Sequence, residues 1–262
     1  MGSIMDATAT ITPSEPAETG DRHEGHQHGH HQDHRHGLRP SSLTAALLAG
    51  VLTCVMLGLG IPQLVGAVSA LGAAAVIEDL QRGHTPDAKA LTAAADSLAH
   101  AAAWDRNGVH DTHRGTVLSA LAETAPSGPE QQALYTQAIA AVRAGLSRAP
   151  GQPHAWTHLA ALLERTGDRI GAADALRLSM LSGAVEPALM LWRIDQGLRL
   201  RALLDPDTVS MLRRQIRLMW VITPEEVAAL SKRPDAAALV QDSLALLTQE
   251  EVDHYIRLHG KR

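Results

Sequence analysis

The sequence predicts an all-α protein in three parts: a disordered N-terminal tail, one transmembrane helix and a helical domain. Two observations predict helices. Ala and Leu dominate the composition, and aromatic residues make up only 2% of the chain, with no Phe. Both features favour helices packed closely through small residues over a β-sheet core. The third observation is the uneven distribution of apolar residues along the 262 residues, which separates the three parts.

The tail, residues 1–42, has almost no large apolar side chains and therefore cannot form a packed core. It holds seven of the fifteen histidines of the chain, namely His23, His26, His28, His30, His31, His34 and His36. Neutral imidazoles bind zinc, nickel and copper, and a flexible segment can gather several of them around one ion. We therefore expect weak and poorly selective metal binding by the tail. The alternative is a solvated, pH-sensitive tail without a ligand.

An apolar run follows the tail. No Asp, Glu, Lys or Arg occurs between Leu43 and Ile77, whereas a membrane-spanning helix needs only about 20 such residues. The most apolar part, residues 43–66, is the predicted transmembrane helix. Pro62 near its end indicates a kink or the approach to the membrane surface. The Ala-rich residues after the span are expected to begin the helical domain.

The charges that flank the span favour an N-terminus in the cytoplasm. Arg35 and Arg39 precede the span, and Glu78 and Asp79 are the first charged residues after it. In a bacterial inner membrane, which the Ala- and Arg-rich composition suggests, the domain would lie in the periplasm. The reversed orientation is one alternative. A signal peptide cleaved after Ala70 is another, although its leader would be unusually long, acidic and rich in histidine.

Within the domain, a pattern of small and large residues recurs after 34 positions. Ala138, Val142, Gly145, Leu146 and Pro150 recur as Ala172, Leu176, Ser179, Met180 and Ala184. Trp156, Leu159, Ala160 and Leu163 precede a Gly167-Asp168 turn at helical spacing. This period and motif resemble the tetratricopeptide repeat (TPR), a helix–turn–helix unit. A weaker copy, Ala94, Leu98 and Ala101, lies upstream, with loops expected at residues 107–108 and 125–129.

The resemblance implies helical repeats over residues 67–187 and a partner-binding groove along the first helix of each unit. The groove residues implied for the clearest unit are His154, Thr157, Ala161, Glu164 and Arg165. The resemblance also implies that Trp156, Leu159, Leu163, Leu176 and Met180 are buried between helices.

Residues 188–262 lose the period and are predicted to form a helical cap. The expected helices cover residues 188–203, 207–221, 224–232, 235–247 and 249–259. Their starts carry helix-capping signatures: Asp205-Pro206, and Thr223 and Thr248 each followed three positions later by Glu.

The sequence offers no catalytic constellation. It has no GxSxG elbow, no phosphate-binding Gly-rich loop and no CxxC pair, because its one cysteine, Cys54, lies in the apolar run. His154 and His158 lie one helical turn apart, but Ala155 stands where an HExxH protease has its general base. A net charge of −5 without a basic run argues against nucleic-acid binding.

We therefore expect a non-enzymatic membrane protein without a cofactor, apart from zinc, nickel or copper on the tail. Its lipid contact is one helix, and its helical repeats hold protein partners at the bacterial inner membrane. Similar layouts suggest envelope polysaccharide assembly as the process. The alternative function is metal homeostasis through the histidine-rich tail.

Overall fold

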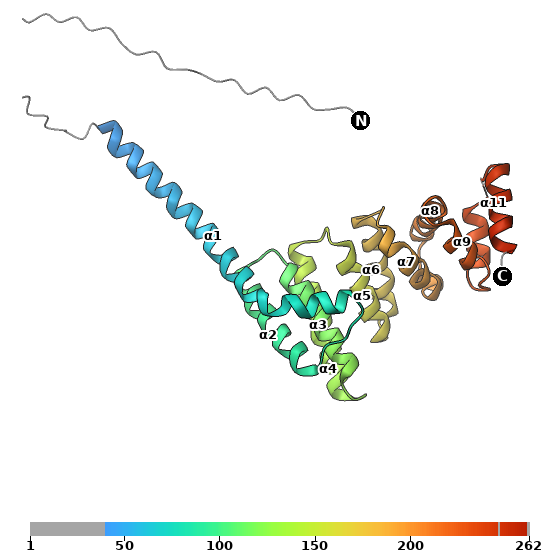
Figure 1. Cartoon of the computed structure of the whole chain (residues 1–262), viewed down its shortest axis with the longest axis horizontal. Coiled ribbons are helices and arrows are strands. Elements are labelled where there is room, and N and C mark those ends of the chain that lie inside the picture. Colours follow the sequence, from blue (N-terminus) through green and yellow to red (C-terminus); the bar gives the residue numbers. More distant parts are fainter. Residues whose placement is uncertain (1–39, 246, 261–262) are drawn as a thin grey trace, which may run out of the picture. The chain divides into compact units, whose positions relative to one another are not determined.

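The computed structural model describes residues 40–245 and 247–260, and in these ranges every regular element is a helix (Figure 1). The predicted all-α fold is confirmed. The seven tail histidines, Arg35, Arg39 and the predicted disorder of the tail lie outside the described residues. The chain divides into two compact units, Met1–Ala49 and Gly50–Arg262, and the second holds most of α1 and all later helices.

Helix α1 runs without interruption from Pro40 to Gln81, with Pro62 inside it. The predicted span and the expected start of the domain therefore belong to one helix, which does not break after residue 66. Every residue from Thr44 to Ile61 is exposed, and burial begins only at Pro62, Val65 and Gly66. The segment Thr44–Gln81, with a mean hydropathy of 2.2 in its apolar window, is long and apolar enough to cross a membrane.

The remaining helices are short and joined by tight loops (Figure 1). They are α2 (Ala88–Trp104), α3 (Val109–Thr124), α4 (Pro129–Arg148), α5 (Pro153–Arg165), α6 (Arg169–Ser182), α7 (Pro187–Arg199), α8 (Pro206–Ile222), α9 (Pro224–Leu230), α10 (Ala237–Ser243) and α11 (Gln249–Gly260). A single turn of 3-10 helix, Arg201–Leu203, precedes α8. The loops expected near residues 107 and 125 and the Gly167 turn are present, and Gly167 adopts a positive φ of 91° that glycine tolerates without strain. In the cap, the helices expected at 188–203 and 235–247 end earlier, as α7 and α10.

Small residues let neighbouring helices approach closely. A Cβ atom on Gly145 of α4 would lie 2.5 Å from Thr112 Cγ2 and 2.6 Å from the Gly108 carbonyl oxygen of α3. Except for Pro150 and Ala184, which are exposed, the positions that recur after 34 residues face the core in both copies: Ala138, Val142, Gly145, Leu146, Ala172, Leu176, Ser179 and Met180 are all buried. The repeat pattern therefore marks the packed sides of α4 and α6.

The core has two apolar clusters. One is formed by α1 to α6 with Leu200 and Leu212, and the other lies among α7 to α11. Leu159, Leu163, Leu176 and Met180 are buried as expected. Trp156 is not: it is only partly buried, and its Nε1 donates to the Pro150 carbonyl oxygen at 2.7 Å. The indole N–H needs a polar partner, which the preceding loop supplies.

A fully buried arginine, Arg193, ties α6 to α7 and α8. Its Nε donates to Ser179 Oγ at 3.0 Å, one terminal nitrogen donates to the Ser179 carbonyl at 2.7 Å, and the other donates to the Gly183 carbonyl at 2.9 Å. Gln215 Oε1 of α8 lies 3.3 Å from that second nitrogen. Carbonyls at the C-terminal end of α6 carry negative partial charge, which stabilises the buried guanidinium. The residue pattern did not predict that this cation is buried.

Candidate partner-binding surface

Three of the five predicted groove residues surround an open pocket between α5 and α7. Ala161, Glu164 and Arg165 of α5 line it together with Trp192 and Arg199 of α7, and its volume is about 340 Å³. We call it the α5–α7 pocket. Because two helices contribute its walls, its shape depends on how α5 and α7 pack and not on α5 alone.

Ion pairs and hydrogen bonds hold the polar walls of the pocket in place. Glu164 receives hydrogen bonds from Arg199 Nε at 2.9 Å and from a terminal nitrogen of Arg199 at 3.2 Å, a bidentate arrangement. Gln196 Nε2 donates to the same carboxylate at 3.3 Å. The Glu164 carboxylate is thus committed to α7, and the position of the Arg199 side chain is fixed.

Arg165 is held from the other side. One of its terminal nitrogens donates to Tyr135 Oη at 2.9 Å, and its guanidinium lies 5.5 Å from the centre of the Tyr135 ring. A second terminal nitrogen lies 3.4 Å from Glu123 Oε1. About half of the Arg165 side chain remains exposed, and the same is true of Arg199. Both guanidinium groups therefore keep donors that a ligand can reach.

Trp192 supplies the apolar wall. It is partly buried and packs against the first apolar cluster. Within residues 40–245 and 247–260, the Trp192 side chain makes no hydrogen bond or ion pair. An indole face beside two arginines suits a ligand that combines an apolar side chain with carbonyl or carboxylate oxygens, as a peptide does.

The other two predicted groove residues lie elsewhere. Thr157 is only 6% exposed, and its Oγ1 lies 2.6 Å from Ser179 Oγ inside the interface between α5 and α6. Its expected place in the groove is wrong, because the rotation of α5 turns this position towards α6. His154 is exposed but lines a separate, smaller pocket of about 130 Å³.

That smaller pocket, between α3 and α5, contains three histidines. His113, His154 and His158 line it with Thr112, Thr116, Gln152 and Ala155. His158 Nε2 lies 3.0 Å from Ser119 Oγ, and burial lowers the pKa of His158 to about 4. Burial also lowers the pKa of His113, with a smaller contribution from nearby His110. Both rings are therefore neutral near pH 7. Among the described residues, no group of three or more His, Cys, Asp or Glu side chains is placed to hold a metal ion.

Comparison with known proteins does not extend this description. The chain matches no family model, no curated protein and no solved structure. The case for a binding surface therefore depends on the geometry of the α5–α7 pocket and on the repeat pattern of the sequence.

The repeat pattern predicted the pocket residues that lie on α5 but not those that lie on α7. Trp192 and Arg199 follow Pro187, where the recognised pattern ended. A signal was nevertheless present, because Pro153 and Pro187 each begin a helix and are 34 residues apart. The same interval separates Arg165 from Arg199. Helix starts therefore extend the period where the small-residue pattern does not.

Proposed function

We propose that this chain is a single-pass membrane protein whose TPR-like helical domain is a scaffold for protein partners. The observation that carries the proposal is the double role of α1. From Thr44 to Ile61 the helix is apolar, uncharged and exposed, whereas from Gly66 onward it packs into the helical domain. A bilayer would cover the first part and leave the domain at its surface.

The α5–α7 pocket supports the binding role. It places an indole and two half-exposed guanidinium groups around an open space, and hydrogen bonds to neighbouring residues already hold both guanidinium groups. Side chains that are ordered before binding lose little conformational entropy when a partner arrives. The described residues offer no comparable arrangement of a nucleophile, a general base and an oxyanion-stabilising group, so a scaffold fits better than an enzyme.

We place the domain on the periplasmic side of a bacterial inner membrane, in envelope polysaccharide assembly. The orientation is supported by Glu78 and Asp79 after the span and by Arg35 and Arg39 before it. The orientation is tested in a variant with Cys54→Ser and Ala93→Cys, whose single cysteine lies on the exposed face of α2. A membrane-impermeant maleimide should label this cysteine in cells whose outer membrane alone is permeabilised. Labelling only after lysis would contradict the orientation.

Partner binding is tested by photo-crosslinking from inside the pocket. A photoreactive amino acid at Ala161 should give defined crosslinked products in membranes, and the same group at exposed Asp174 on α6 should not. Arg165→Glu should reduce the products from Ala161 several-fold, because it reverses a charge at the pocket. Arg143→Glu, the same reversal on exposed α4, should leave them unchanged. Equal products with both variants would contradict the proposal.

The alternative function, metal homeostasis, draws on the seven tail histidines. Calorimetric titration of zinc into the full chain separates the two functions. Binding only in the high micromolar range or weaker would exclude metal buffering. Tight binding that is abolished when the seven histidines are replaced by Gln would favour it.

A further inference from the structure

The corner between α2 and α3 lies where α1 loses its packing partner. A Cβ on Gly72 would lie 3.0 Å from Ser97 Oγ, and a Cβ on Gly66 would lie 2.7 Å from Asp105 Cβ. Helices α1 and α2 therefore run antiparallel, and the C-terminal end of α2 points towards the exposed part of α1. Gly58 and Gly60, about two turns before Gly66, have no atom within 4 Å of an added Cβ. The corner is thus the last part of the domain to touch α1 before the exposed segment.

The length of α1 sets the depth of this corner. Cys54 lies near the middle of the predicted span, and Gly66 follows twelve residues later. At 1.5 Å per residue, Gly66 is about 18 Å along the helix axis from Cys54. Half of the hydrocarbon core of a bilayer is about 15 Å thick. If Cys54 lies at the bilayer centre, Gly66 and the adjoining corner lie at the level of the lipid headgroups.

Three exposed side chains at this corner suit that environment. Trp104, the last residue of α2, is 53% exposed, and Val109, the first residue of α3, is 37% exposed. Arg106 between them is exposed, and within the part of the chain that the structure describes its side chain makes no hydrogen bond or ion pair. Tryptophan is enriched at membrane interfaces, and arginine pairs well with phosphate.

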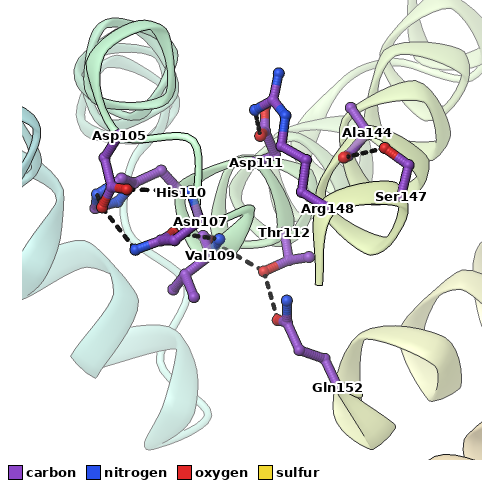
Figure 2. A network of polar contacts seen from close by, with 10 residues as sticks. All are labelled: Asp105, Asn107, Val109, His110, Asp111, Thr112, Ala144, Ser147, Arg148 and Gln152. Carbon is purple, nitrogen blue, oxygen red and sulfur yellow. Dashed lines mark hydrogen bonds and ion pairs between the residues drawn. The ribbon is translucent and has the colours of Figure 1, made fainter. Parts of the chain in front are cut away.

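The two aspartates at the same corner, Asp105 and Asp111, are engaged in hydrogen bonds and ion pairs, as Figure 2 shows. The Asp105 carboxylate accepts hydrogen bonds from the Asn107 backbone nitrogen at 3.0 Å and from Asn107 Nδ2 at 2.6 Å. His110 Nε2 lies 3.4 Å from the same carboxylate. Asp111 pairs with Arg148 at the end of α4. Both carboxylates are mostly buried and paired, which weakens their repulsion of lipid phosphates, and their contacts hold the corner together.

We infer that Trp104, Arg106 and Val109 form a contact with phospholipid headgroups that fixes the depth of the helical domain at the membrane. This inference rests on the proposed anchoring by α1. The indole and the valine enter the interface, and the Arg106 guanidinium pairs with a lipid phosphate. A domain held in this way keeps the α5–α7 pocket at a set height above the bilayer, because α2 to α7 pack as one compact unit.

The test measures depth with nitroxide labels in the full chain, reconstituted in vesicles of phosphatidylcholine and phosphatidylglycerol. One sample is labelled at native Cys54, the second at Trp104→Cys and the third at Ala93→Cys, the last two in a Cys54→Ser background. Ala93 is the matched control, because it is exposed on the same face of α2, eleven residues or three turns from Trp104. Accessibility to oxygen, which enters lipid, is compared with accessibility to a water-soluble nickel complex.

We expect position 54 to be accessible mainly to oxygen, position 93 mainly to nickel, and position 104 to have an intermediate ratio. A ratio at position 104 equal to that at position 93 would overturn the interfacial contact while leaving the anchor intact. A ratio equal to that at position 54 would also overturn it, because the corner would then lie in hydrocarbon. A water-like ratio at position 54 would instead contradict the anchor.

The contact of Arg106 with lipid phosphate is tested separately. With the label at position 104, Arg106→Glu should shift the ratio towards that of position 93, since the new carboxylate is repelled by phosphatidylglycerol. Arg143→Glu, on exposed α4 away from the corner, should leave the ratio unchanged. An unchanged ratio in Arg106→Glu would remove the phosphate contact from the inference.

Discussion

The two halves of α1 are both rich in apolar residues but differ in their neighbours. From Thr44 to Ile61 every residue is exposed, and a Cβ atom added to Gly50, Gly58 or Gly60 would meet no atom within 4 Å. From Gly66 to Gln81 the same helix buries Gly66, Ala73 and Val76 against the domain. The first half carries large aliphatic side chains that are exposed. The second half is rich in Ala and Gly, which suit close helix contacts.

The type of apolar residue, and not only its hydrophobicity, distinguishes the exposed half of α1 from the packed half. Large side chains gain most from leaving water, and those of the first half are exposed on a helix long and apolar enough to cross a membrane. Small side chains gain less from burial but allow backbone-to-backbone approach, as between Gly66 and Asp105.

The largest effect is expected from charges in the exposed half. Leu52→Arg with Val55→Arg should abolish stable insertion, because each arginine near the centre of a membrane helix costs about 2.5 to 3.5 kcal/mol. Val68→Arg with Leu71→Arg is the matched control, since both residues are exposed but lie beyond the expected hydrocarbon core. The measurement is the fraction of protein that floats with lipid vesicles. Equal flotation of the two variants would show that the two halves of α1 do not differ in their contact with lipid.

The packed domain, unlike the exposed half of α1, buries a titratable group at His158. Burial lowers the pKa of His158 from 6.5 to about 4, so the unfolded chain binds a proton first as the pH falls. The free energy of unfolding should therefore decrease between pH 6.5 and pH 4, by at most about 3 kcal/mol from this group. His158→Gln should flatten that part of the profile in urea titrations of the full chain in nonionic detergent. The same slope in both proteins would show that His158 is not responsible.

A smaller effect is expected from glycines in the two halves. Gly66→Val should destabilise the contact between α1 and α2 by about 1 to 3 kcal/mol, because the new side chain meets Asp105 and the Ala101 carbonyl. Gly58→Val should have little effect, since nothing packs there. Hydrogen exchange of the α2 amides in the full chain measures the difference. Equal protection in the two variants would mean that α1 does not pack on α2.

Local signals predicted the helices well, because helix ends are set by nearby residues. Thr248 and Glu251 form the expected reciprocal cap: the Thr248 backbone nitrogen donates to Glu251 Oε2 at 2.8 Å. The similar signature at Thr223 does not form one. The Thr223 backbone nitrogen already donates to the Met219 carbonyl oxygen at 2.7 Å, a bond that closes α8. One N–H cannot serve both helix ends, and the sequence pattern does not record this competition.

The candidate site was only half predictable, because it depends on contacts between distant residues. Ala161, Glu164 and Arg165 follow from the position of α5 in the repeat pattern. The contribution of Trp192 depends on the packing of α7, and the burial of Thr157 on the rotation of α5 against α6. A shift of one residue turns a helical side chain by about 100°, so a groove assignment from spacing alone easily fails at one position.

Whether α1 anchors the protein in a bilayer is tested by alkaline carbonate extraction of membranes from cells that express the full chain. Peripheral proteins are released by this treatment, whereas proteins held by a membrane-spanning helix stay with the lipid. We expect the native chain to remain in the membrane fraction and Leu52→Arg with Val55→Arg to be released. Release of the native chain would show that the exposed half of α1 is not covered by lipid, and the proposed anchor would then be wrong.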